Sequence, residues 1–206
     1  MSIFKAVTYK GNQIDTLKDK IAYLVNPEKT DPRLLQKWLQ KWMEKELFPA
    51  CPSPQLILSC VGHQCLNDFL FFSDVIMRNQ RLRGTVWKKA YDHFIIRFDE
   101  RDKKVPPSKV VEALQEILIL FCFRTGGVYV GMMAAHFDTD IPHAHFLIDT
   151  IDIRNGHRRN LDRIQFYQLR CSINKILYEH DLSRLRIKPL DKKVSPSGRG
   201  RVLMLS

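Results

Sequence analysis

Apolar residues recur at helical spacing in several segments of the chain. From Asp15 to Leu24 the spacing of Leu17, Ile21 and Leu24 forms one apolar stripe, and Asp15 is a suitable N-cap. The same period is found over residues 31–47, 64–82, 106–125 and 161–181, the last preceded by Asn160 as a candidate cap. These segments are predicted to be helices.

Other segments alternate between apolar and polar residues, as half-buried strands do. The alternation covers residues 2–9, 91–99, 128–136 and 143–152. In the second of these, Phe94, Ile96 and Phe98 share one face, and His93, Ile95 and Arg97 share the other. Asn155-Gly156 marks a tight turn after the last strand.

The order of these elements predicts an α+β fold with a central antiparallel sheet. The strands at residues 128–136 and 143–152 are close enough in sequence to form an antiparallel hairpin. Helices would cover one face of the sheet in a two-layer sandwich. The other face would then carry His143 and His145, together with His93 and Arg97.

The charge of the chain favours a polyanionic partner. The 206 residues include 33 Lys and Arg against 22 Asp and Glu, which gives a net charge of +11. Nucleic acid is favoured over a membrane, because no apolar run is long enough for a transmembrane helix and the N-terminus lacks the pattern of a signal peptide. The five cysteines show no repeating framework, which indicates a reduced, cytoplasmic setting.

The segment from His136 to His145 concentrates the chemistry of the chain. His143 and His145 are two residues apart in a predicted strand, so both imidazoles point to the same face. With His136 they would form a divalent-metal site with open coordination positions. An all-nitrogen donor set suits Mn²⁺ better than Ca²⁺. Asp138 is a candidate acceptor for the free N–H of one imidazole.

Three segments together resemble a known family. His136, Asp138 and the ending Pro142-His143-Ala-His145 are similar to the metal motif of the HUH endonucleases, and most closely of the conjugative relaxases (mobilisation nucleases). The segment before Asn26-Pro27-Glu28-Lys29-Thr30 resembles the one in which these enzymes carry their DNA-attacking tyrosine, here Tyr23. The segment from Tyr91 to Phe98 is similar to the family's histidine-bearing strand.

The resemblance implies a specific activity. It implies a relaxase domain over residues 1–187, followed by a basic flexible tail at 188–206. The domain would use Mn²⁺ or Mg²⁺ to nick single-stranded DNA at an origin of transfer, leaving a 5′-phosphotyrosine on Tyr23, in the cytoplasm of a bacterium. Accessory DNA-binding and coupling proteins would be further partners.

Further site residues are predicted around this centre. His93 is a candidate for a phosphate contact or for assisting the base. DNA contacts are predicted for Lys29, Arg81, Arg83 and Arg97. One position departs from the family pattern: relaxases usually have Asn four residues after the last histidine, where this chain has Asp149.

Two other functions remain open at this point. In HUH replication initiators and transposases the tyrosine follows the histidines, and Tyr167 or Tyr178 would occupy that place. Tyr9 and Tyr91 are further tyrosines that could attack. A non-catalytic nucleic-acid-binding module with a structural metal is the remaining alternative.

Overall fold

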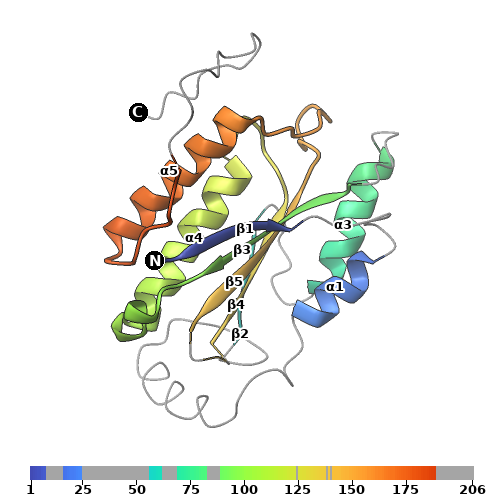
Figure 1. The fold of residues 1–206 in the computed structure, drawn as a ribbon. Coiled ribbons are helices and arrows are strands. Elements are labelled where there is room, and N and C mark those ends of the chain that lie inside the picture. Colours follow the sequence, from blue (N-terminus) through green and yellow to red (C-terminus); the bar gives the residue numbers. More distant parts are fainter. Residues whose placement is uncertain are drawn as a thin grey trace.

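The computed structural model describes residues 1–7, 16–24, 56–61, 69–82, 89–123, 125–137, 139 and 141–188. Within these residues, strands form an antiparallel sheet in the order β1-β3-β5-β4-β2 (Figure 1). The strands are β1 (Ile3–Val7), β2 (Leu56–Val61), β3 (Tyr91–Arg97), β4 (Gly131–His136) and β5 (His143–Asp149). The helices are α1 (Leu17–Leu24), α3 (Phe69–Leu82), α4 (Pro107–Phe123) and α5 (Arg163–Glu179), with a 3₁₀ turn η2 (Glu100–Lys104).

The register of the strands divides the sheet into two faces. His93 pairs with Leu147, Ile95 with His145, and Arg97 with His143 across β3 and β5. Directly paired residues of neighbouring strands point to the same face. This face, which we call the histidine face, holds His93, Arg97, His143 and His145. The opposite face, which we call the core face, holds the alternate residues, among them Phe94 and Phe146.

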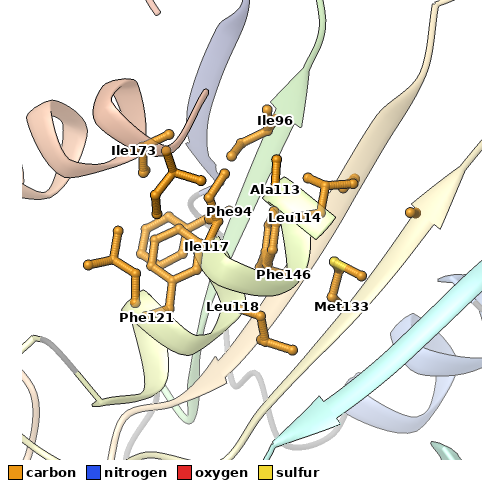
Figure 2. Close-up of a cluster of buried hydrophobic side chains, with 14 of the residues drawn as sticks. Phe94, Ile96, Ala113, Leu114, Ile117, Leu118, Phe121, Met133, Phe146 and Ile173 are labelled. Carbon is orange, nitrogen blue, oxygen red and sulfur yellow. The ribbon is translucent and has the colours of Figure 1, made fainter. Parts of the chain in front are cut away.

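Helices α4 and α5 cover the core face (Figure 1). Their buried side chains pack against Phe94, Met133 and Phe146 of three adjacent strands, as Figure 2 shows. Gly131 permits a close approach, because a Cβ atom there would lie 2.5 Å from the Cys122 sulfur of α4. The predicted inward positions in β3 and β5 are therefore confirmed.

Helices α1 and α3 pack on part of the histidine face (Figure 1). Leu17, Ile21 and Leu24 of α1 form a second apolar cluster with Ile76 of α3. The sheet contributes Tyr91, Val130, Met132, Ala134 and Leu147 to the same cluster. This second helical layer was not anticipated from the sequence. Its consequence is that α1 lies immediately beside the histidines.

The predicted α+β fold with a central antiparallel sheet is confirmed, with corrections of detail. Strand β4 begins at Gly131 rather than at residue 128, and β2 and η2 were not predicted. The N-cap of α5 is Asp162, not Asn160, because Asp162 and Gln165 form a reciprocal capping box. The helix predicted at 31–47 and residues 189–206 of the basic tail lie outside the described residues.

Candidate metal centre on the histidine face

Three histidines converge where β4 and β5 pair. His136 is the direct cross-strand partner of His143, and His145 lies two residues further along β5. One ring nitrogen from each of the three residues lies within 4.8 Å of the others. The ring centroids are 5.0 Å apart for His136 and His143 and 5.4 Å apart for His143 and His145. Within the described part of the chain, this is the group of side chains that could hold a metal ion.

A fourth histidine supports this group from the neighbouring strand. The Nε2 atom of His93 lies 2.9 Å from Nδ1 of His145. If Nδ1 of His145 donates this hydrogen bond, its Nε2 lone pair is free for a metal ion, and the ring is held in one tautomer. His93 is only 4% exposed, so its position is set by packing in the sheet. The contact makes His93 an outer partner of a ligand rather than a residue at the surface.

A backbone atom holds His136 in a similar way. Its Nε2 lies 2.9 Å from the carbonyl oxygen of Leu24, the last residue of α1. A carbonyl oxygen can only accept, so Nε2 carries the proton and Nδ1 keeps its lone pair. The second ligand is therefore also fixed in a metal-binding tautomer, in this case by a helix terminus.

The surroundings favour the neutral form of His145 and His93. Burial, with smaller contributions from the nearby His93, His136 and His143, lowers the pKa of His145 to about 2. Burial, with a smaller contribution from Lys20, lowers the pKa of His93 to about 4. Neutral imidazoles are the form that binds a metal ion. The all-nitrogen donor set, the tautomer of His136 and the neutral form of His145 fit a divalent transition metal such as Mn²⁺.

Helix α1 places a tyrosine beside this centre. Tyr23 is 51% exposed, whereas Ile21 and Leu24 on the same helix are buried against the sheet. Tyr23 directly precedes Leu24, whose carbonyl oxygen contacts His136. The ammonium group of Lys20, one turn earlier, lies 5.2 Å from the centroid of the Tyr23 ring. The predicted nucleophile is therefore accessible to solvent and directly precedes the residue that contacts His136.

Comparison with known proteins identifies the family. The model of the relaxase family, described as a MobA/VirD2-like nuclease domain, matches residues 59–182, more than half of the chain. The chain belongs to this relaxase family. Among curated proteins no match is found.

Two solved relaxase structures have the same fold. Both are of the MobM relaxase domain (MOBV; Mob_Pre) with bound Mn and plasmid pMV158 oriT DNA. The complex with 22 nucleotides is 12% identical in sequence, with a TM-score of 0.56 over 91% of this chain and 90% of that one. The complex with 23 nucleotides is 14% identical, with a TM-score of 0.59 over 98% and 94%. At this level of identity the likeness concerns the fold.

Two of the basic residues predicted to contact DNA lie in different parts of this relaxase. Arg97 is exposed on the histidine face, directly across from His143. Arg81 is exposed near the end of α3. The residue before it, Gln80, contacts Asp149, the last residue of β5, whereas His143 is the first residue of that strand. Arg97 is therefore close to the candidate metal centre and Arg81 is not. Asp138, Lys29 and Arg83 lie outside the described residues.

The other candidate tyrosines of the relaxase are badly placed. Helix α5, which carries Tyr167 and Tyr178, packs through Leu169 and Ile173 into the core on the opposite face of the sheet. Tyr91 is fully buried beneath α1 and α3. Tyr9 lies outside the described residues. Among the tyrosines that the structure describes, Tyr23 is the exposed one beside the histidines.

Asp149 has a structural environment in this relaxase. It is completely buried and accepts hydrogen bonds from Asn79 (2.6 Å) and Gln80 (3.1 Å) of α3 and from the backbone N–H of Ile151 (3.0 Å). Burial raises its pKa to about 6, although these hydrogen bonds act in the opposite direction. Asp149 thus links α3 to the C-terminal end of β5 through hydrogen bonds.

Sequence reasoning missed two contacts of the site. The hydrogen bond between His93 and His145 depends on the register of β3 with β5, which residue spacing does not determine. Lys20 was not singled out, although its position three residues before Tyr23 places the two side chains together on a helix.

Proposed function

We propose that this chain is a metal-dependent, site- and strand-specific DNA relaxase of the HUH superfamily. It would nick one strand at an origin of transfer and hold the cleaved strand through a covalent 5′-phosphotyrosine on Tyr23, which initiates conjugative mobilisation. The observation that carries the proposal is the position of α1. The helix contacts one of three converging histidines through the carbonyl of Leu24, and the residue before Leu24 is the exposed Tyr23.

The residues of the histidine face would have different roles in this reaction. His136, His143 and His145 would hold a divalent cation, Mn²⁺ or Mg²⁺, which when bound polarises a non-bridging oxygen of the scissile phosphate. The contact with the Leu24 carbonyl holds His136 in the tautomer that this requires, and the contact with His93 does the same for His145 when Nδ1 of His145 is the donor. Arg97, opposite His143, is placed to contact a phosphate of the same strand.

Tyr23 would carry out the displacement. As the bond from its oxygen to phosphorus forms, the hydroxyl proton passes to solvent, and the bond from phosphorus to the 3′ oxygen breaks. The 3′ oxygen leaves and takes up a proton. One phosphodiester is exchanged for another, so the strand can later be rejoined without an external energy source.

The comparisons support the choice of substrate and metal. The MobM relaxase domain was solved with oriT DNA and Mn. The net charge of +11 suits a nucleic-acid substrate. No helix among the described residues is long and apolar enough to cross a membrane. We expect the protein to act in the bacterial cytoplasm, with accessory DNA-binding and coupling proteins as further partners.

The test is adduct formation by the full chain. The protein is incubated with Mn²⁺ and a labelled single-stranded oligonucleotide library, and any cross-linked peptide is identified by mass spectrometry. Wild type should form an adduct at Tyr23, and Tyr23→Phe, which keeps the ring and removes the attacking oxygen, should form none. EDTA should also abolish the adduct.

Tyr178→Phe is the matched control, because Tyr178 is exposed on the opposite side of the sheet. An adduct that persists in Tyr23→Phe but disappears in Tyr167→Phe or Tyr178→Phe would replace the relaxase mechanism by that of a replication initiator. Nicking by Tyr23→Phe without an adduct would indicate attack by water. Binding of DNA without an adduct or a nick in any protein would indicate a non-catalytic module.

A further inference from the structure

Lys20 occupies an unusual position between two parts of the site. It precedes Tyr23 by one helical turn, and its ammonium lies 5.2 Å from the centroid of the tyrosine ring. It also precedes Leu24 by four residues, so the two lie on neighbouring positions of the same side of α1. The carbonyl of Leu24 contacts His136, so Lys20 lies about one helical turn from the residue of α1 that touches the candidate metal centre.

The charge of Lys20 reaches the candidate metal centre. Burial is the main cause of the lowered pKa values of His93 and His145, and the positive charge of Lys20 contributes to both. Lys20 is half-buried in this position. The other lysine of α1 differs, because Lys18 is 60% exposed and pairs with Asp74 of α3 at 3.1 Å.

A cation at this place works against the binding of a metal ion. Like charges repel, and the ammonium is carried on α1 one turn before the residue whose carbonyl contacts His136. The arrangement becomes favourable once an anion lies between the ammonium and the metal ion. A DNA phosphate at the histidines, within reach of the Tyr23 oxygen, would be such an anion.

We propose that Lys20 is a catalytic residue that contacts the scissile phosphate and neutralises the charge that passes from the Tyr23 oxygen to the phosphate oxygens. This inference rests on the proposed function. In the displacement, the tyrosine oxygen loses its proton and the non-bridging oxygens gain negative charge as the new bond forms. A cation already in place beside both groups stabilises this charge without reorganisation.

A purely structural role makes different predictions. If Lys20 only packs its stem against Tyr23, Lys20→Met keeps the packing and the reaction. If Lys20 only adds to the general attraction for DNA, its loss weakens binding as much as the loss of Lys18, the other lysine of α1. The experiment therefore needs a binding constant, a rate at saturation and a metal affinity.

The full-length variants Lys20→Met, Lys20→Arg, Lys18→Met and Tyr23→Phe are compared with wild type. The DNA is an oligonucleotide that wild type cleaves. Single-turnover adduct formation is measured at saturating DNA, and the dissociation constant of the DNA is measured with EDTA present. Binding of Mn²⁺ without DNA is measured by calorimetry, and thermal unfolding checks that each variant is folded.

For Lys20→Met we expect adduct formation to slow by about 100-fold, while its DNA dissociation constant changes no more than that of Lys18→Met. Its affinity for Mn²⁺ should equal or exceed that of wild type, because a repulsive charge is removed. A variant that merely damaged the site would bind Mn²⁺ more weakly. Lys20→Arg, which keeps the charge, should stay within about tenfold of the wild-type rate.

Three outcomes overturn the inference. The first is an equal rate for Lys20→Met and Lys18→Met, the second is a rate for Lys20→Arg as low as that of Lys20→Met, and the third is a loss of Mn²⁺ affinity in Lys20→Met in proportion to its rate. If Tyr23→Phe forms no adduct in these cases, the proposed function stands without Lys20. If Tyr23→Phe still forms the adduct, the proposed function fails and the inference fails with it.

Discussion

The Nε2 atom of His93 lies 2.9 Å from Nδ1 of His145, and the contact joins the central strands β3 and β5 on one face of the sheet. His93 is buried and His145 is half-buried, so this hydrogen bond is partly shielded from solvent. The relationship makes the orientation of one candidate metal ligand depend on a residue that is 52 positions away in the chain.

His93→Ala should therefore weaken the binding of Mn²⁺ by about 10- to 100-fold, which is typical for the loss of an outer partner of a ligating histidine. Isothermal titration calorimetry measures the change, and His157→Ala is the control because His157 is exposed in the turn that follows β5. An unchanged Mn²⁺ affinity in His93→Ala would mean that the hydrogen bond does not orient His145.

Arg97→Leu tests the predicted phosphate contact opposite His143. The variant should bind single-stranded DNA more weakly. The slope of log affinity against log salt concentration should also be shallower by about 0.7, the value for one lost phosphate contact on a single strand. Fluorescence anisotropy at several salt concentrations gives both numbers. Arg101→Leu is the comparison, because Arg101 is exposed in η2 and pairs with Asp99. Equal slopes for the two variants would remove Arg97 from the DNA contacts.

Asp149→Asn tests the buried carboxylate at the far end of β5. Burial raises the pKa of Asp149 from 3.8 to about 6, so in this range the folded protein holds a proton that the unfolded chain releases. Its contribution to stability is full below about pH 4 and is lost as the pH rises through about 6. Asparagine at position 149 does not titrate. The side-chain amide of Asn79 can rotate so that its oxygen accepts a hydrogen bond from the N–H₂ group of the new asparagine.

The free energy of unfolding of Asp149→Asn relative to wild type should consequently rise between about pH 4 and about pH 7, by on the order of 2 kcal/mol. Urea unfolding at the two pH values measures this difference. A pH-independent difference would show that Asp149 is already ionised without cost in the folded protein.

Arg159→Met tests a buried ion pair that the site does not use. The Arg159 side chain is 1% exposed and donates to Asp92 at 2.8 and 3.0 Å. Burial alone would raise the pKa of Asp92, but Arg159 and Lys89 hold it below its usual value. Removing the guanidinium should cost about 3–5 kcal/mol, because the carboxylate stays buried with a weaker partner.

The double variant Asp92→Leu/Arg159→Met should recover most of this loss, since neither charge then remains in the interior. Chemical denaturation of the three proteins provides the comparison. A double variant as unstable as the single one would attribute the loss to packing rather than to the unpaired charge.

The local pattern of the sequence predicted the elements that carry the site. Alternation placed His143 and His145 on one face and Phe146 in the core, because a strand has only two faces. Strand β2 was missed because Leu56-Ile-Leu58 is a short continuous apolar run, which shows no alternation. The cap of α5 was misplaced by two residues because Asn160 and Asp162 are both good caps, and Gln165 decides between them through a contact.

The relationships between elements could not be obtained in this way. Residue spacing predicts neither the packing of α1 on the histidine face nor the contact of the Leu24 carbonyl with His136. Both depend on which apolar stripe docks on which part of the sheet, and many dockings satisfy the same pattern.

The contact between the Leu24 carbonyl and His136 has a thermodynamic consequence for the helix that carries Tyr23. If docking of α1 stabilises the bound metal ion by some free energy, metal binding stabilises the docked helix by the same amount, because the coupling between two binding events is reciprocal. The backbone amides of α1 should therefore exchange with deuterium more slowly after Mn²⁺ is added, without any DNA present. An element at the N-terminal end of the chain would then report on the occupancy of strands more than a hundred residues away, since the contact spans 112 positions.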